Sequence, residues 1–289
     1  MDAAPYGLIE QAGAGVRRVL ARNPSPFTFT GTQTHIVGTG EVAVVDPGPD
    51  LPEHVEAVLA ATKGERVAAI LVTHTHKDHS PAARALSAAT GAPVVGCAPV
   101  VPVDAGALGS ESFDLDYAPD RVLGEGETVK GAGWTLRAVA TPGHMSNHLC
   151  FAYEEERALF SGDHVMGWST SVILPPDGNM GQYMASLAKL QGRDDRIYYP
   201  AHGPVVQAPG KLVRGMIAHR RSREVQIRRL LEEGASGIPD IVARSYPALD
   251  AALIPAAGAS VLAHLIDLEA RGLVRRAGDV WAGDVWSLA

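Results

Sequence analysis

The chain has 289 residues, a formal net charge of −7 and 46% hydrophobic residues, which is enough length and apolar content for one sizeable domain and a small second one. No apolar stretch is long enough to cross a bilayer, so a membrane-spanning protein is excluded. Cys97 and Cys150 lie among apolar residues, which predicts buried free thiols in a reducing compartment and excludes a disulfide framework. The N-terminus lacks the apolar core of a signal peptide, and we therefore expect a cytoplasmic protein.

Strand-like and helical patterns alternate along most of the chain. Helical patterns occur at residues 52–62, 81–90 and 179–191. Between them lie short, continuous apolar runs such as residues 67–72, which are typical of strands buried on both faces. We therefore expect an α/β fold in which loops between strands and helices carry the functional side chains.

The last part of the chain predicts a small second unit. A long helix is expected over residues 211–233, and two helices and a two-stranded wing are expected over residues 234–289. This outline is winged-helix-like and divides the chain into domains of residues 1–210 and 211–289. The second predicted helix of the unit offers mainly small, apolar and acidic side chains, so we expect packing or dimerisation more than nucleic-acid binding.

The loop that follows the apolar run is rich in metal-binding side chains. Within "ILVTHTHKDHSP", residues 70–81, four potential ligands occupy six positions: His74, His76, Asp78 and His79. Neutral imidazole nitrogens and carboxylate oxygens are the usual ligands of Zn²⁺ outside all-cysteine sites. Ligands two residues apart can converge on one ion while Asp78 and His79 turn towards a neighbouring position, which predicts a dinuclear site.

Three later turns supply further donors for two metals. Each follows a strand-like run: His144 in "TPGHMSNH", Asp163 in "FSGDHV" and His202 in "YYPAHGP". A carboxylate such as that of Asp163 can bridge two cations, so one aspartate suffices between two histidine-rich half-sites. Seven candidate ligands are therefore present.

At this point the sequence resembles the metallo-β-lactamase-fold hydrolases, whose signature T-H-x-H-x-D-H is present as residues 73–79. "NPSPFTFTGTQTHIVG" and "VVDPGPD" look like the opening strands of that family, and "TPGH", "SGD" and "YPAHGP" follow in the family's order. "HRRSREVQI" and the small C-terminal unit resemble most closely the beta-lactamase-like protein two group. The resemblance covers nearly the whole chain and implies an αββα sandwich followed by a winged-helix-like C-terminal domain.

The same resemblance implies a ligand set and a cofactor. One Zn²⁺ is expected on His74, His76 and His144, the other on Asp78, His79 and His202, with Asp163 as the bridge. Two Zn²⁺ per chain are expected, and other divalent metals are possible. Such a centre acidifies a shared water towards a pKa of ~7, and the resulting hydroxide attacks the substrate. We expect Asp78 to orient this hydroxide as a catalytic residue.

Three further residues are candidates for substrate contact. Lys77 places a cation beside the metal pair, where it can attract an anionic group or simply be exposed. His148 follows the "TPGH" loop, with a structural role as the alternative. Trp168 lies in "GWSTSVILPPDGNM", residues 167–180, a segment expected to border the mouth of the site or to be a plain connector.

The substrate class stays open at this stage, because the family hydrolyses several kinds of bond. Residues 211–233 carry seven Lys or Arg against three Glu, whereas residues 1–210 carry a net charge of −9. Single-stranded RNA, cleaved as by an endoribonuclease, is the first hypothesis. The alternative is a thioesterase or a lactonase or esterase acting on a small acyl substrate. A non-catalytic metal-binding interaction protein is disfavoured because all seven ligand positions are occupied. The expected partners are one of these substrates and a second copy of the chain, with no membrane.

Overall fold

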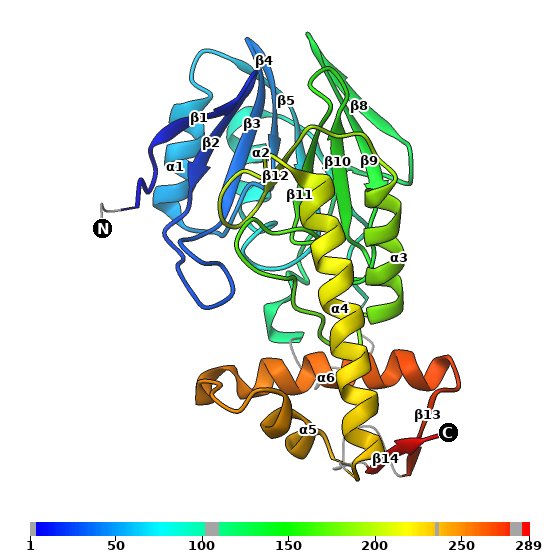
Figure 1. The fold of residues 1–289 in the computed structure, drawn as a ribbon. Coiled ribbons are helices and arrows are strands. Elements are labelled where there is room, and N and C mark those ends of the chain that lie inside the picture. The colour runs from blue at the N-terminus through cyan, green and yellow to red at the C-terminus, as the bar shows by residue number, and fades with distance from the viewer. Residues whose placement is uncertain (1–3, 102–109, 235–236, 278–284) are drawn as a thin grey trace.

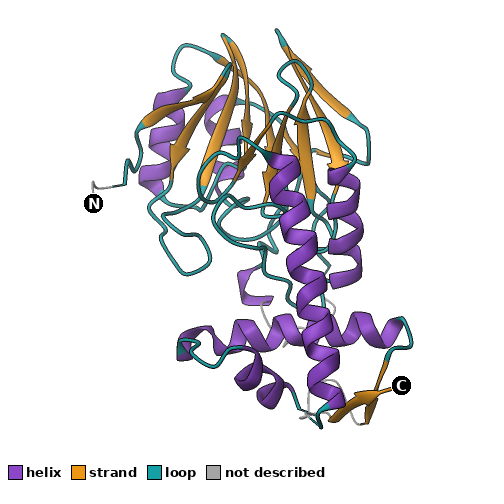
Figure 2. Cartoon of the chain, in the orientation of Figure 1, coloured by secondary structure: helices purple, strands orange, loops and turns teal. Residues whose placement is uncertain are grey.

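The computed structural model describes residues 4–101, 110–234, 237–277 and 285–289. Two β-sheets face each other, and helices cover the outer face of each sheet (Figures 1 and 2). The first sheet contains, in spatial order, β1 (Ile9–Gly13), β2 (Val16–Leu20), β3 (Gln33–Thr39), β4 (Glu41–Val45), β5 (Arg66–Val72), β6 (Val94–Gly96) and β7 (Arg121–Val122). The second sheet contains β12 (Ile197–Pro200), β11 (Ala158–Gly162), β10 (Leu149–Tyr153), β9 (Trp134–Ala140) and β8 (Thr128–Gly131).

The main core lies between the two sheets. Val37 and Leu71 project from the first sheet on the face of His35, whose ring contacts Phe160 of the second sheet. Together with Phe151 and Phe160 of the second sheet, they belong to one buried cluster. Strands β4, β5 and β6 are parallel to one another, and a parallel strand that is covered on both faces needs a continuous apolar sequence. This explains why residues 67–72 lack polar alternation, as predicted.

Four helices form the outer layers. α1 (Pro52–Ala61) and α2 (Ala82–Thr90) lie on the first sheet, whereas α3 (Met180–Gln191) and the upper half of α4 (Pro209–Glu232) lie on the second (Figure 1). Gly91 ends α2 in a left-handed conformation with φ of 72°, which a residue without Cβ adopts at no steric cost. The predicted helices at 52–62, 81–90 and 179–191 are thus confirmed, and the architecture is the αββα sandwich.

The C-terminal unit has the predicted winged-helix outline. It contains α5 (Ile238–Ser245), α6 (Ile254–Ala270) and the antiparallel pair β13 (Val274–Ala277) and β14 (Val285–Leu288). A short 3₁₀ turn, η2 (Ala251–Leu253), precedes α6, and another, η1 (Ser110–Ser112), lies in the sandwich between β6 and β7. Its own core joins side chains of α4, α6 and the wing, including Ile227, Leu265 and Trp286. The unit therefore packs around the lower half of α4 (Figure 1).

Helix α4 connects the two units continuously. Val213 and Ile217 in its first half belong to the core beneath the second sheet, and this same core includes Ala263 of α6. Because residues of α4 belong to the cores of both units, no boundary between the units is evident within this helix. The predicted division between residues 210 and 211 therefore stays a prediction. Cys97 and Cys150 are buried free thiols, as expected. Among the residues that the structure describes, no helix is long and apolar enough to cross a membrane.

Candidate metal centre

The candidate ligands gather at one edge of the sandwich because each follows the end of a strand. The loop with His74, His76, Asp78 and His79 leaves the carboxyl end of β5 and leads into α2. His144 follows β9, Asp163 follows β11 and His202 follows β12, which runs parallel to β11. Carboxyl ends of parallel strands share an edge of a sheet, so sequence-distant loops meet there.

Three imidazole nitrogens form the first half-site. Nδ1 of His76 lies 3.0 Å from Nε2 of His74 and 3.1 Å from Nε2 of His144. A tetrahedral Zn²⁺ with bonds of about 2.0–2.1 Å separates its ligands by roughly 3.3–3.4 Å. The three nitrogens are therefore spaced as ligands of one ion.

The second half-site consists of two imidazoles and one carboxylate. Oδ2 of Asp78 lies 3.3 Å from Nε2 of His79 and 3.2 Å from Nε2 of His202. Both histidines are buried, whereas Asp78 is half-buried at the edge of a cavity. Oδ2 also accepts a hydrogen bond of 2.9 Å from the Thr32 hydroxyl, which fixes the orientation of the carboxylate.

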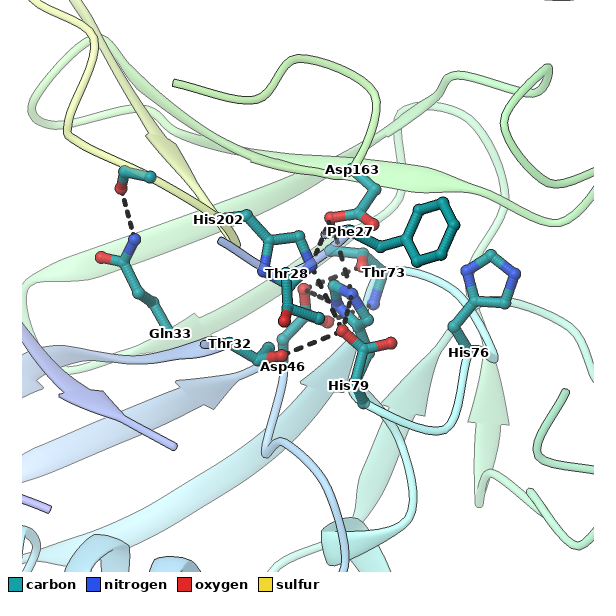
Figure 3. A network of polar contacts seen from close by, with 12 residues as sticks. Phe27, Thr28, Thr32, Gln33, Asp46, Thr73, His76, His79, Asp163 and His202 are labelled. Carbon is teal, nitrogen blue, oxygen red and sulfur yellow. Dashed lines mark hydrogen bonds and ion pairs between the residues drawn. The ribbon is translucent and has the colours of Figure 1, made fainter. Parts of the chain in front are cut away.

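Asp163 lies between the two half-sites, with one oxygen facing each. Oδ1 is 3.2 Å from Nε2 of His202 and 3.5 Å from Nε2 of His79. Oδ2 is 3.6 Å from Nε2 of His144 and 4.0 Å from Nε2 of His74. Figure 3 shows Asp163, His202 and His79 converging on this point. The carboxylate is thus placed as a bridge between two cations.

The donor set fits a pair of metal ions. Nε2 of His79 and Oδ1 of Asp163 are buried and have no hydrogen-bond partner among the described residues, although buried polar atoms are normally satisfied. The ligand atoms in each of two groups, one of four residues and one of three, lie within 4.8 Å of one another. Imidazole and carboxylate donors suit Zn²⁺ and other divalent first-row metals.

Asp46, to which the sequence reasoning assigned no role, holds part of this site. It directly follows β4, and its Oδ1 accepts the backbone N–H of Thr73 at 2.8 Å. Its Oδ2 accepts the Thr73 hydroxyl at 2.9 Å and Nδ1–H of His79 at 3.1 Å. A proton held on Nδ1 leaves Nε2 of His79 free to bind a metal. The aspartate in "VVDPGPD" directly after an apolar strand was the available signal.

Two other ligand histidines, His144 and His202, are oriented by hydrogen bonds from Nδ1 in the same way. Nδ1–H of His144 donates to the carbonyl of Val172 at 2.6 Å, and Nδ1–H of His202 donates to the carbonyl of Gly31 at 3.2 Å. Each ring therefore turns Nε2 towards the centre of the site. Acceptors behind ligand histidines are typical of metal sites and raise ligand basicity.

Comparison with known proteins places this arrangement in a family. The model of the Metallo-beta-lactamase superfamily matches residues 28–202, a range that includes every candidate ligand. The chain belongs to the metallo-beta-lactamase superfamily. The Beta-lactamase associated winged helix domain matches residues 238–286. The chain therefore combines a domain of this superfamily with a winged-helix domain.

Two curated relatives and one solved structure illustrate the similarity. An atrochrysone carboxyl ACP thioesterase from Cryptosporiopsis sp. (strain 8999) is 32% identical over 235 residues, which is 79% of this chain and 66% of the relative. A beta-lactamase-like protein 2 homologue from Caenorhabditis elegans is 34% identical over 232 residues, 78% of this chain and 74% of the relative. A beta-lactamase domain protein from Burkholderia ambifaria superposes with a TM-score of 0.82 at 22% identity, covering 100% of this chain and 96% of that one.

In this member of the superfamily, the two half-sites differ in electrostatics. Burial lowers the pKa of His76 to about 3, and the neighbouring His144 adds to this effect. Burial opposes the charged form of His202 as well, yet the carboxylates of Asp163 and Asp78 raise the pKa of His202 to about 10. The pKa of His79 is also raised, against its burial, by Asp78 and Asp163. His79 and His202 must therefore lose protons before a metal can bind them.

The raised pKa of His202 predicts how the stability of metal-free protein depends on pH. Because the pKa of folded His202 lies above its ordinary value of 6.5, its ion pair contributes full stability below about pH 6.5 and loses it as pH rises through about 10. We expect the melting temperature in chelator to fall more steeply between pH 7 and 10 for the wild type than for His202→Gln. Parallel curves for the two proteins would contradict this.

The candidate metal centre opens into a cavity of about 600 Å³. His76, Asp78, His144, Asp163 and His202 form its floor. Its other walls combine polar residues, namely Asn23, Ser25, Thr28, Lys77, Glu111 and Ser112, with apolar ones, namely Phe27, Pro49, Met166, Val172, Leu174, Pro255 and Ala256. The metal ligands therefore face a space large enough for a small organic substrate.

The three predicted substrate contacts have different surroundings. Lys77 is exposed at the cavity wall, and its Nζ donates to the carbonyl of Glu111 at 2.7 Å. His148 is buried beneath the site, where its Nε2 accepts the backbone N–H of Asp163 at 3.2 Å, so it contacts a ligand residue and not the cavity.

Trp168 is not among the described residues that line the cavity. Its ring stacks on Phe29 with centroids 5.0 Å apart, and Phe27 of the same loop lines the cavity. Within its own segment, Val172 and Leu174 line the cavity directly. The segment of residues 167–180 therefore borders the cavity as expected, but through Val172 and Leu174 and not through Trp168.

Proposed function

We propose that the chain hydrolyses a small acyl thioester, using two Zn²⁺ held by His74, His76 and His144, by Asp78, His79 and His202, and by the shared Asp163. One observation carries the choice of substrate: the metal ligands line a cavity whose exposed surface is mainly hydrocarbon, although polar residues also border it. An apolar wall beside polar reacting groups is what an acyl substrate needs. The names of relatives support the same choice, since several are atrochrysone carboxyl ACP thioesterases.

The charge distribution argues against RNA, the first hypothesis from the sequence. Neutralising phosphates requires several exposed cations, and Lys77 is the one Lys or Arg among the described residues that line the cavity. The basic side chains of α4 are partly engaged within the chain. Arg220 is buried, Arg223 lies over the Tyr246 ring and Arg229 pairs with Glu233.

The side chains around the site have separable tasks in this reaction. When bound, the metal ions polarise the thioester carbonyl, activate the attacking water and stabilise the negative charge that develops. Asp163 keeps the two half-sites together. Asp78, oriented by Thr32, lines the cavity and is placed to accept a proton from the attacking water. A thiolate, whose conjugate thiol has a pKa of about 8.5, leaves without a strong acid to protonate it.

The proposal is tested by offering the zinc-loaded protein four substrates in parallel: an acyl thioester, a lactone, a β-lactam and single-stranded RNA. We expect the thioester to have the highest kcat/KM, and chelation to abolish its hydrolysis. The metal-free protein, reloaded with Zn²⁺, is the matched control. RNA cleavage without thioester hydrolysis would overturn the proposal in favour of the nuclease hypothesis.

A further inference from the structure

The C-terminal domain contributes part of the cavity wall. Pro255 and Ala256, in the first turn of α6, line the same cavity as the metal ligands. Phe27 and Leu174, from two loops of the sandwich, line it as well. All four side chains are apolar, so this wall combines hydrocarbon surface from both units.

A buried arginine ties α6 to the loop that carries Leu174. Arg220 of α4 is 5% exposed, and its guanidinium donates to the carbonyl of Ser171 and, at 3.3 Å, to the hydroxyl of Ser260 in α6. It also lies over the Tyr183 ring of α3, with 5.4 Å to the centroid. Within the described part of the chain it forms no ion pair. A buried cation is costly unless it is hydrogen-bonded, and Nε of Arg220 has no partner among the described residues. The bonds to Ser171 and Ser260 therefore hold the guanidinium and connect α4, α6 and the loop.

The helical spacing then determines which face of α6 meets the cavity. Ala256 and Ser260 are four residues apart and therefore lie on one face of the helix. One turn further, Ala263 belongs to the core beneath the second sheet. A Cβ on Gly181, at the start of α3, would lie 2.6 Å from Oδ1 of Asp267. The helix is thus packed on the sandwich along this side, with its first turn at the cavity.

We infer that the first turn of α6 is the recognition surface for the acyl group, so that the winged-helix domain selects the size of the acyl substrate. This inference rests on the proposed thioesterase function, and it specifies that the acyl group is the part of the substrate that the protein recognises. An apolar acyl chain or aromatic ring packs between Ala256 and Pro255 on one side and Leu174 and Phe27 on the other. Its thioester group then lies towards the metal ligands on the cavity floor.

Binding of stable analogues tests the inference without catalysis. We would use ketones in which a methylene group replaces the thioester sulfur, with acetyl, hexanoyl and 2-naphthoyl groups, and titrate each into zinc-loaded protein by calorimetry. Burial of each methylene group strengthens binding by about fourfold at most. We expect the hexanoyl and naphthoyl analogues to bind at least about tenfold more tightly than the acetyl analogue. Equal affinities of the wild type for all three would overturn the inference, whatever the enzyme hydrolyses.

Variants assign the selectivity to α6. Ala256→Trp and the smaller Ala256→Leu fill the space at the wall and should reduce the preference for the larger analogues, by at least about tenfold for the tryptophan variant. Adding Leu174→Ala to Ala256→Trp should restore part of the preference for the larger analogues, because the smaller side chain returns space to the cavity. Ala251→Leu, at an exposed position in η2 before α6, is the matched control and should keep the wild-type preference. An unchanged preference in both folded Ala256 variants would overturn the inference.

The outcome is distinguishable from failure of the proposed function. If the wild type prefers the large analogues but hydrolyses no thioester, the recognition surface stands and the reaction assigned to the site is wrong. If thioesters are hydrolysed with a size preference that Ala256→Trp and Ala256→Leu do not alter, the reaction stands and the role of α6 is wrong.

Discussion

Asp78→Asn is expected to abolish hydrolysis while leaving the protein folded. The substitution keeps the size of the side chain and an oxygen for the Thr32 hydroxyl, but it removes the negative charge that lies 3.2 Å from Nε2 of His202 and 3.3 Å from Nε2 of His79. A weaker ligand and the loss of the proton acceptor should lower kcat by about 10²–10⁴-fold. The measurement is steady-state hydrolysis of the preferred substrate at saturating Zn²⁺.

The fold should survive because its stability comes mainly from burial between the sheets, while bound metal adds stability by linkage. Asp116→Asn is the matched control, since Asp116 is exposed and its pairing with Arg84 spans 3.7 Å. Cooperative thermal unfolding of both variants would verify that they are folded. Near-full turnover by folded Asp78→Asn protein would show that Asp78 has no catalytic role.

Asp46→Asn is expected to weaken the half-site of His79, so that one of the two proposed metal ions is lost, although Asp46 is not itself a proposed ligand. The amide oxygen can still accept the N–H of Thr73, so its NH₂ group must face Nδ1 of His79. This neighbour favours the tautomer with the proton on Nε2, the atom 3.5 Å from Oδ1 of Asp163, and a protonated nitrogen is no ligand. Loss of such an orienting group typically costs 10–100-fold in metal affinity or activity. The metal content per chain, measured after dialysis, should therefore fall from about two equivalents towards one.

A companion variant separates positioning from structure. Asp46→Ala leaves three buried donors without an acceptor and should lower the free energy of unfolding by about 3–5 kcal/mol, whereas Asp46→Asn should lower it much less. Asp114→Asn is the control, because Asp114 is also buried and accepts from Ser80 but contacts no ligand atom. Two tightly held equivalents in Asp46→Asn would contradict the tautomer argument.

Much of the fold was readable from local patterns. Continuous apolar runs mark strands that are covered on both faces, and the helices at 52–62, 81–90 and 179–191 were predicted within a residue or two of their ends. The winged-helix outline followed from the same periodicities. Such patterns depend on which face of an element is buried, a property that sequence spacing expresses directly.

The sequence by itself also determined the chemistry of the site, because a cluster such as His74 to His79 brings its donors together through one short loop. It did not reveal what orients these donors, and of their surroundings it indicated only Lys77 and the segment of residues 167–180. The hydrogen bonds of Asp46 to His79, the burial of His148 beneath Asp163 and the cavity wall on α6 join residues that are distant along the chain. Only the packing of the two sheets and of α6 against them decides these contacts, since no local periodicity records which distant loops meet.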